Sequence, residues 1–148
     1  MSEHAGQSIE ENAHYSITSD DENGTLVFSW KPVAGLGIRD MQDGIATFAG
    51  QCKLRKPAQA VIDARKLDPD SPARAWVSSQ KTFPGQEDYG PWWSREIVPV
   101  YNDAGIASLA VATGDPNAPG EIASAPPGVT FKMGFFPNLD AAMRWRVD

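Results

Sequence analysis

The chain has 148 residues, of which 41% are hydrophobic and 22% are charged, a composition typical of a soluble globular protein. This length accommodates one domain of ordinary size. The formal net charge of −6 arises from residues 1–22, which contain six acids and neither Lys nor Arg, so the rest of the chain is formally neutral. A neutral body without a basic stripe argues against nucleic acid as a partner.

The hydrophobic pattern excludes further classes. The longest apolar run covers residues 106–112 and contains a serine, whereas a membrane-spanning helix needs roughly 20 residues. The N-terminus has neither the positive region nor the apolar core of a secretory signal. One cysteine cannot form an internal disulfide, and with two histidines it cannot form a structural zinc site. We therefore expect a cytoplasmic protein that holds no metal and no cofactor.

Residues 1–13 are polar and acidic without periodicity, which predicts a flexible acidic tail. Strands are predicted over 15–18 and 25–30, where apolar and polar residues alternate in the second segment. The Asn23-Gly24 pair between them is a strong hairpin signal.

A helix and a buried strand follow the hairpin. Gly44 is expected to weaken this helix by about 1 kcal/mol relative to alanine, and Pro57 closes the segment. The continuous apolar run within 58–63 predicts a central strand covered on both faces. The helix is indicated by apolar residues at spacings of three and four, namely Ile38, Met41, Ile45, Phe48 and Cys52.

Two helical segments are predicted next. Ser71 and Pro72 suit the cap and first position of a helix that carries Trp76. A second helical stretch runs over 91–103, and Pro99 is expected to kink it because proline lacks the backbone donor.

The last third predicts a buried strand over 108–113, a loop rich in proline and glycine over 114–128 and an alternating strand over 129–135. Asn138 is placed to cap a final helix over 139–146. Helices that fall between buried strands predict an α/β layer with parallel neighbouring strands.

Several segments together resemble the SpoIIAA-like proteins of the STAS/Sec14 group. A tryptophan-containing helix with an internal proline over 93–101 is followed by Ala-Gly at 104–105 and a strand over 108–113. The segment 136–145 is similar to the closing pattern of that group, with an aromatic residue before a short helix that carries paired alanines and a tryptophan. Residues 60–65 look like its central strand, which ends in aspartate with an arginine nearby.

The resemblance implies one α/β domain over 14–148. This domain would contain a four- to five-stranded mixed sheet with helices packed on it. It also implies a non-enzymatic role in binding a protein partner or an apolar or lipid-like ligand. The chain departs from the anti-sigma-factor antagonists, because residues 65–72 lack their Asp-Ser-Ser-Gly-like phosphorylation motif. Ser71 holds a comparable place, so a module regulated by phosphorylation is the alternative function.

Aromatic residues are dense in the second half of the chain. Trp92 and Trp93 are adjacent, so on a helix they point about 100° apart and do not easily bury on one face. Either one of them lines a groove for an apolar small molecule, a lipid, a membrane surface or a protein partner, or both pack into the core. Opening of the groove would use a hinge over 83–85. The groove would be lined by Trp76, Phe83, Tyr89, Trp92, Trp93, Ile97 and Tyr101.

Few residues suggest catalysis. Asp63 and Arg65 follow a central strand, where they are either polar anchors of a ligand crevice or a local ion pair. Cys52 ends an apolar stripe, and the histidines, His4 and His14, lie in or beside the tail, so a core thiol is favoured. We expect no catalytic residues, with Asp63 as the acid or base of a small enzyme as a remaining alternative. Formation of a homodimer is a further possibility that the sequence leaves undecided.

Overall fold

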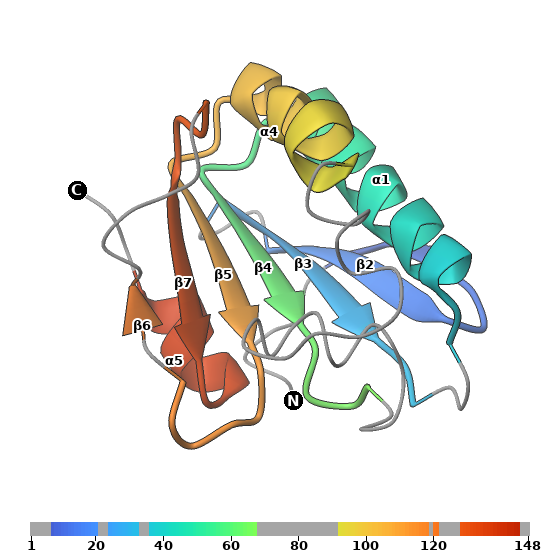
Figure 1. The fold of residues 1–148 in the computed structure, drawn as a ribbon, viewed down its shortest axis with the longest axis vertical. Helices are drawn as coiled ribbons and strands as arrows, with labels where there is room; N and C mark the ends of the chain where they lie inside the picture. The colour runs from blue at the N-terminus through green and yellow to red at the C-terminus, as the bar shows by residue number, and fades with distance from the viewer. Residues whose placement is uncertain are drawn as a thin grey trace.

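The computed structural model describes residues 7–20, 24–32, 36–67, 92–118, 120–121 and 128–145. The strands among these residues form a seven-stranded sheet in the order β1-β2-β3-β4-β5-β7-β6 (Figure 1). Neighbours pair in parallel from β3 through β4 and β5 to β7, and the outer pairs β1/β2, β2/β3 and β6/β7 are antiparallel. The strands are β1 (Gln7–Glu11), β2 (Tyr15–Asp20), β3 (Thr25–Trp30), β4 (Gln59–Asp63), β5 (Ser108–Ala112), β6 (Gly120–Glu121) and β7 (Lys132–Phe136).

The α/β class with a mixed sheet and packed helices is confirmed, but the count of four to five strands is wrong, because β1 and β6 were not predicted. The prediction of a flexible tail over 1–13 is wrong for β1, which pairs with β2. The strand β1 contains a single apolar residue, Ile9, so it lacks the alternation that marks a strand in sequence, and its register shifts between Ser8 and Glu10. The strand β6 lies inside the predicted loop 114–128 and has only two residues, too few for a pattern.

The predicted hairpin and the predicted central strands are confirmed. The hairpin β2–β3 pairs Tyr15 with Trp30 at one end and Asp20 with Thr25 at the other. Every residue of β4 and of β5 is buried, as the continuous apolar runs indicated.

The predicted helix after the hairpin is α1 (Ile38–Arg55). The Asp40 carboxylate accepts the N–H of Gly37 at 3.4 Å, which satisfies a donor at the helix start. At the other end, Lys56 adopts the left-handed conformation with a φ of 51° and donates its N–H to the Cys52 carbonyl at 2.7 Å. The chain then turns away from the helix axis towards β4.

Gly44 lies where α1 packs on β3. A Cβ atom at this position would stand 2.8 Å from Cη2 of Trp30 and 3.2 Å from Cζ of Phe28. Both rings are buried and pack edge to face, with their centroids 4.7 Å apart. The glycine that the sequence marks as a weak point of the helix therefore permits the close approach of α1 to the sheet.

The helical stretch that contains Pro99 is divided. A π-helical turn, η1 (Trp93–Ile97), leads directly into α4 (Val98–Ala104), and the Val98 N–H donates to the Trp93 carbonyl five residues earlier. Proline has no N–H, and its ring clashes with the carbonyl four residues before it in a regular α-helix. The disruption expected at Pro99 is thus accommodated by a wider turn rather than by the end of the helix.

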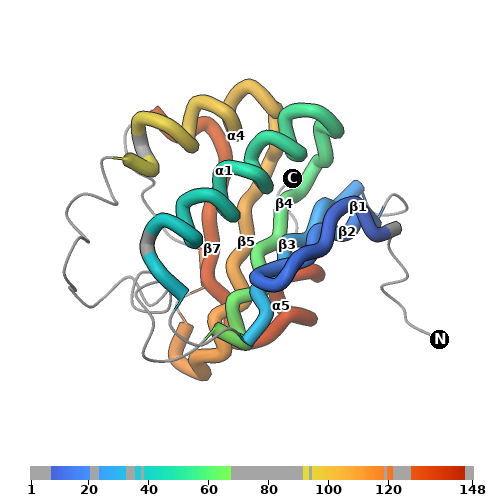
Figure 2. Tube along the Cα trace, turned by 90° about the vertical axis from the view of Figure 1, so that its right-hand side faces the viewer, coloured from blue at the N-terminus to red at the C-terminus, as the bar shows by residue number. Residues whose placement is uncertain are grey.

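The sheet has a helix layer on each face. The helices α1, η1 and α4 cover one face, and α5 (Leu139–Arg144) packs against β4, β5 and β7 on the other (Figures 1 and 2). Asn138 caps α5 as predicted, because its side-chain oxygen accepts the Ala141 N–H at 2.8 Å. The larger core, below α1 and α4, includes Leu26, Phe28, Trp30, Phe48 and Tyr101, and the smaller core, below α5, includes Val27, Val61, Ala110, Ala142 and Met143.

Candidate functional site

The described part of the predicted aromatic groove lies on η1 and α4, and most of it is buried. Trp93, Ile97 and Tyr101 are 7%, 2% and 0% exposed and belong to the larger core, whereas Trp92 is half-buried against the edge of that core. In this conformation, these residues therefore form packed structure rather than an open groove. The other predicted members, Trp76, Phe83 and Tyr89, lie outside the described residues, as does Ser71.

Tyr101 is the centre of the contact between α4 and the rest of the fold. Its ring lies 6.4 Å from that of Phe48 on α1 and 5.5 Å from that of Phe131, which precedes β7, both in edge-to-face geometry. Such pairs contribute about 0.5–1.5 kcal/mol each beyond the area that they bury. This end of α4 is thus fixed to two separate elements by aromatic packing.

Polar contacts also gather at the C-terminal end of α4. The side chain of Asn102 donates to the Gly128 carbonyl at 2.8 Å, and its oxygen accepts the backbone N–H and the hydroxyl of Thr130 at 3.1 and 2.7 Å. The Lys56 ammonium donates to the Asp103 carbonyl at 3.3 Å. The helix is therefore anchored at its C-terminal end, and Trp93 and Ile97 of the preceding turn pack into the larger core.

Asp63 and Arg65 meet at the carboxyl end of β4. The guanidinium donates to both carboxylate oxygens at 2.8 Å, from Nε and from Nη2, and the Arg65 backbone N–H donates to Oδ1 at 3.2 Å. Hydrogen bonding to the buried carboxylate raises the pKa of Arg65. The pair is thus the local ion pair and turn cap that the sequence left open, and a ligand at this edge would meet the half-exposed guanidinium rather than a free carboxylate.

The neighbouring strand end is also held by side-chain hydrogen bonds. The Thr113 hydroxyl donates to the Phe136 carbonyl at 3.2 Å and accepts the N–H of Asp115 at 3.0 Å. The Thr113 side chain therefore links the carboxyl ends of β5 and β7.

The described residues offer little for covalent or metal chemistry. Cys52 is fully buried, and burial raises the pKa of its thiol to about 12, so the thiolate needed for nucleophilic attack is not formed at neutral pH. The described residues contain no group of three or more His, Cys, Asp or Glu side chains that could hold a metal ion.

A buried polar network was missed by the sequence reasoning. Gln59, at the start of β4, donates from Nε2 to the carbonyls of Ala142 and Trp145 at 3.3 and 2.6 Å, and its oxygen accepts the Thr25 hydroxyl at 3.4 Å. The side chain thereby satisfies carbonyl groups at the C-terminal end of α5. The available signal was a glutamine directly before a run of buried apolar residues, since a buried polar side chain needs partners.

Comparisons with protein families, with curated proteins and with solved structures find no significant match to this chain. Within the described residues, no helix has both the length and the apolar character required to cross a membrane.

Proposed function

We propose that the protein is a non-enzymatic binding domain that takes an apolar or lipid-like ligand beneath η1 and the start of α4. The observation that carries this proposal is the π-helical turn with Trp93 and Ile97 on its core side, directly before Pro99. Turns of this kind interrupt the regular hydrogen-bond ladder and are frequent at functional sites. Because the side chains beneath the turn are apolar, they would favour an apolar ligand over a polar one.

The hydrogen bonds at the C-terminal end of α4 provide a pivot about which η1 would move. The C-terminal end is held through Asn102 and Tyr101, and the opposite end contributes Trp93 to the core. A shift of η1 about the anchored end would open space beside Trp93 without breaking the Asn102 hydrogen bonds. The half-buried Trp92 next to it would meet the incoming ligand first.

A non-enzymatic role is favoured by the state of the described reactive groups. Both carboxylate oxygens of Asp63 accept hydrogen bonds from Arg65, so that the carboxylate is occupied by a partner within the fold, and the Cys52 thiol stays protonated. The resemblance to SpoIIAA-like proteins points the same way, towards binding rather than catalysis.

The proposal is tested by titrating the protein with N-phenyl-1-naphthylamine, an uncharged apolar probe, and following the fluorescence of the probe. We expect Trp93→Ala to weaken probe binding by about tenfold per folded molecule, which corresponds to about 1.4 kcal/mol. Trp145→Ala is the matched control, because this tryptophan packs on Phe136 beside the smaller core, with ring centroids 5.2 Å apart.

Each variant's folded fraction is measured by circular dichroism, so that lost binding is separated from lost structure. The proposal is wrong if the wild-type protein does not bind the probe, or if both tryptophan variants bind it with the same affinity per folded molecule. Sedimentation with neutral phosphatidylcholine vesicles then compares a dissolved ligand with a membrane surface. Vesicle binding that is lost in Trp92→Ala, without binding of the dissolved probe, would assign the site to membranes instead.

A further inference from the structure

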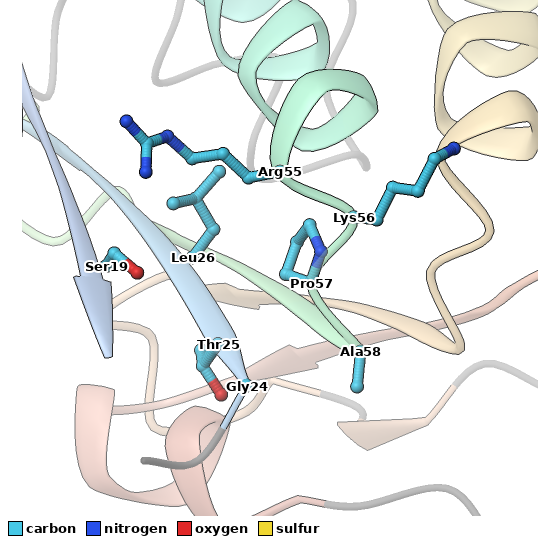
Figure 3. A pocket seen from close by; sticks show the side chains of 8 residues that line it. All are labelled: Ser19, Gly24, Thr25, Leu26, Arg55, Lys56, Pro57 and Ala58. Atoms are coloured by element: carbon cyan, nitrogen blue, oxygen red, sulfur yellow. The ribbon is translucent and has the colours of Figure 1, made fainter. Parts of the chain in front are cut away.

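A pocket of about 330 Å³ lies at the end of the sheet where the central strands β3 and β4 begin. Asp63 and Arg65 lie at the opposite ends of these strands, and the pocket shares no lining residue with η1 or α4. Its volume is at the lower end of the range for small-molecule sites. The pocket is lined by Ser19, Gly24, Thr25, Leu26, Arg55, Lys56, Pro57 and Ala58 (Figure 3).

The path of the backbone creates this hollow. The helix α1 ends at Lys56, and the following segment returns to the sheet, where the N–H groups of Ala58 and Gln59 donate to the Gly24 carbonyl at 2.8 and 3.2 Å. Gly24 has no side chain and Ala58 only a methyl group, so the space below the helix end is left open. The buried side chain of Leu26 forms an apolar floor.

Arg55 supplies charge to this pocket. Its side chain extends from the end of α1 across Leu26 towards β2, where Ser19 lies (Figure 3). Nε donates to the Gln51 oxygen at 3.2 Å, and no carboxylate of the described residues forms an ion pair with the guanidinium. The neighbouring Lys56 points the other way, towards α4, and donates to Asp103.

We propose that this pocket binds a small amphipathic carboxylate. The guanidinium of Arg55 presents two parallel N–H donors, a geometry that matches a carboxylate. A short alkyl chain would lie against Leu26 and Pro57, and the hydroxyl of Ser19 lies on the same side of the sheet as Leu26, its cross-strand partner. The apolar floor selects a ligand with a hydrocarbon part, and the small volume restricts that part to a few carbons.

The test uses the full chain and three probes of equal chain length, hexanoate, hexanol and hexylammonium, followed by NMR shift titration. We expect hexanoate to bind more tightly than the other two, and its affinity to fall as salt is added. Arg55→Gln should raise its Kd at least tenfold, whereas Arg39→Gln, an exposed arginine at the opposite end of α1, should leave it unchanged.

Ala58→Leu is a second variant that fills the pocket from an exposed position and should also abolish binding without disturbing the core. The proposal is overturned if hexylammonium binds as well as hexanoate, if hexanoate does not bind, or if the two arginine variants behave alike. Because the pocket is separate from the π-helical turn, its failure would leave the binding of an apolar probe near Trp93 untouched.

Discussion

Replacement of Gly44 by alanine tests how closely α1 approaches the sheet. In an exposed helix interior, this change stabilises a protein by about 1 kcal/mol, because alanine has the higher helix propensity. At position 44 the added methyl group would stand 2.8 Å from Cη2 of Trp30, whereas carbon atoms in contact prefer about 3.5–4.0 Å. The ring or the helix must therefore move by about 0.7 Å or more.

The cost of this movement is expected to exceed the gain in propensity. Trp30 is 2% exposed and its ring packs against Phe28 and Tyr15, so no empty space receives it. Overpacking of a core typically costs about 1–3 kcal/mol. Gly44→Ala should consequently destabilise the fold by up to about 2 kcal/mol, despite the better helix former.

Gly50 provides the matched control in the same helix, since a Cβ atom there would meet nothing within 4 Å. Gly50→Ala should stabilise the protein by as much as about 1 kcal/mol. Urea unfolding followed by circular dichroism compares the two variants, and each kcal/mol corresponds to about 2–4 °C in Tm for a chain of this size. Equal stabilisation by both changes would refute the close packing of α1 on β3.

Two further predictions concern buried polar groups. Gln59→Leu should cost about 2–3 kcal/mol, because it leaves the Ala142 and Trp145 carbonyls without their side-chain donor, and it should accelerate hydrogen exchange in α5. Half-buried Gln51→Leu on α1 is the control. Unchanged exchange in α5 of the Gln59 variant would contradict a stabilising role of these hydrogen bonds. Cys52 has its pKa raised from 9.0 to about 12, so above pH 9 the unfolded thiol loses its proton while the folded one keeps it, and stability falls by about 1.4 kcal/mol per pH unit. Cys52→Ala removes this contribution, so unfolding at pH 8, 9 and 10 should show a shallower decline than in the wild-type protein, and identical slopes would disprove it.

The elements that were predicted correctly carry local patterns. The apolar stripe of α1, the continuous apolar runs of β4 and β5 and the asparagine before α5 each reflect contacts within a few residues or uniform burial. The strand β1 was missed because its one apolar residue, Ile9, gives no alternation, and β6 was missed because it pairs through the backbone of two residues.

The candidate sites were less predictable, since they depend on which elements pack together. The spacing of Ile97 and Tyr101 identifies one face of a helix, but it does not reveal that this face is covered by the sheet and by α1. The pocket beside Arg55 results from the place where α1 ends relative to β3, which no local pattern encodes. Ion pairing of Asp63 with Arg65, by contrast, was a stated alternative, because residues two apart after a strand can reach each other.

The bulged strand β1 has a consequence for how the molecule behaves at high concentration. As the last strand on its side of the sheet among the described residues, it is the place where another chain would add and extend the sheet. The register shift twists this edge, and its two glutamates are held by the fold, Glu10 by the Tyr15 hydroxyl and Glu11 by the Lys31 ammonium, both at 2.8 Å. Acidic residues that the sequence assigns to a flexible tail therefore place charge on an edge strand, a feature that disfavours edge-to-edge pairing.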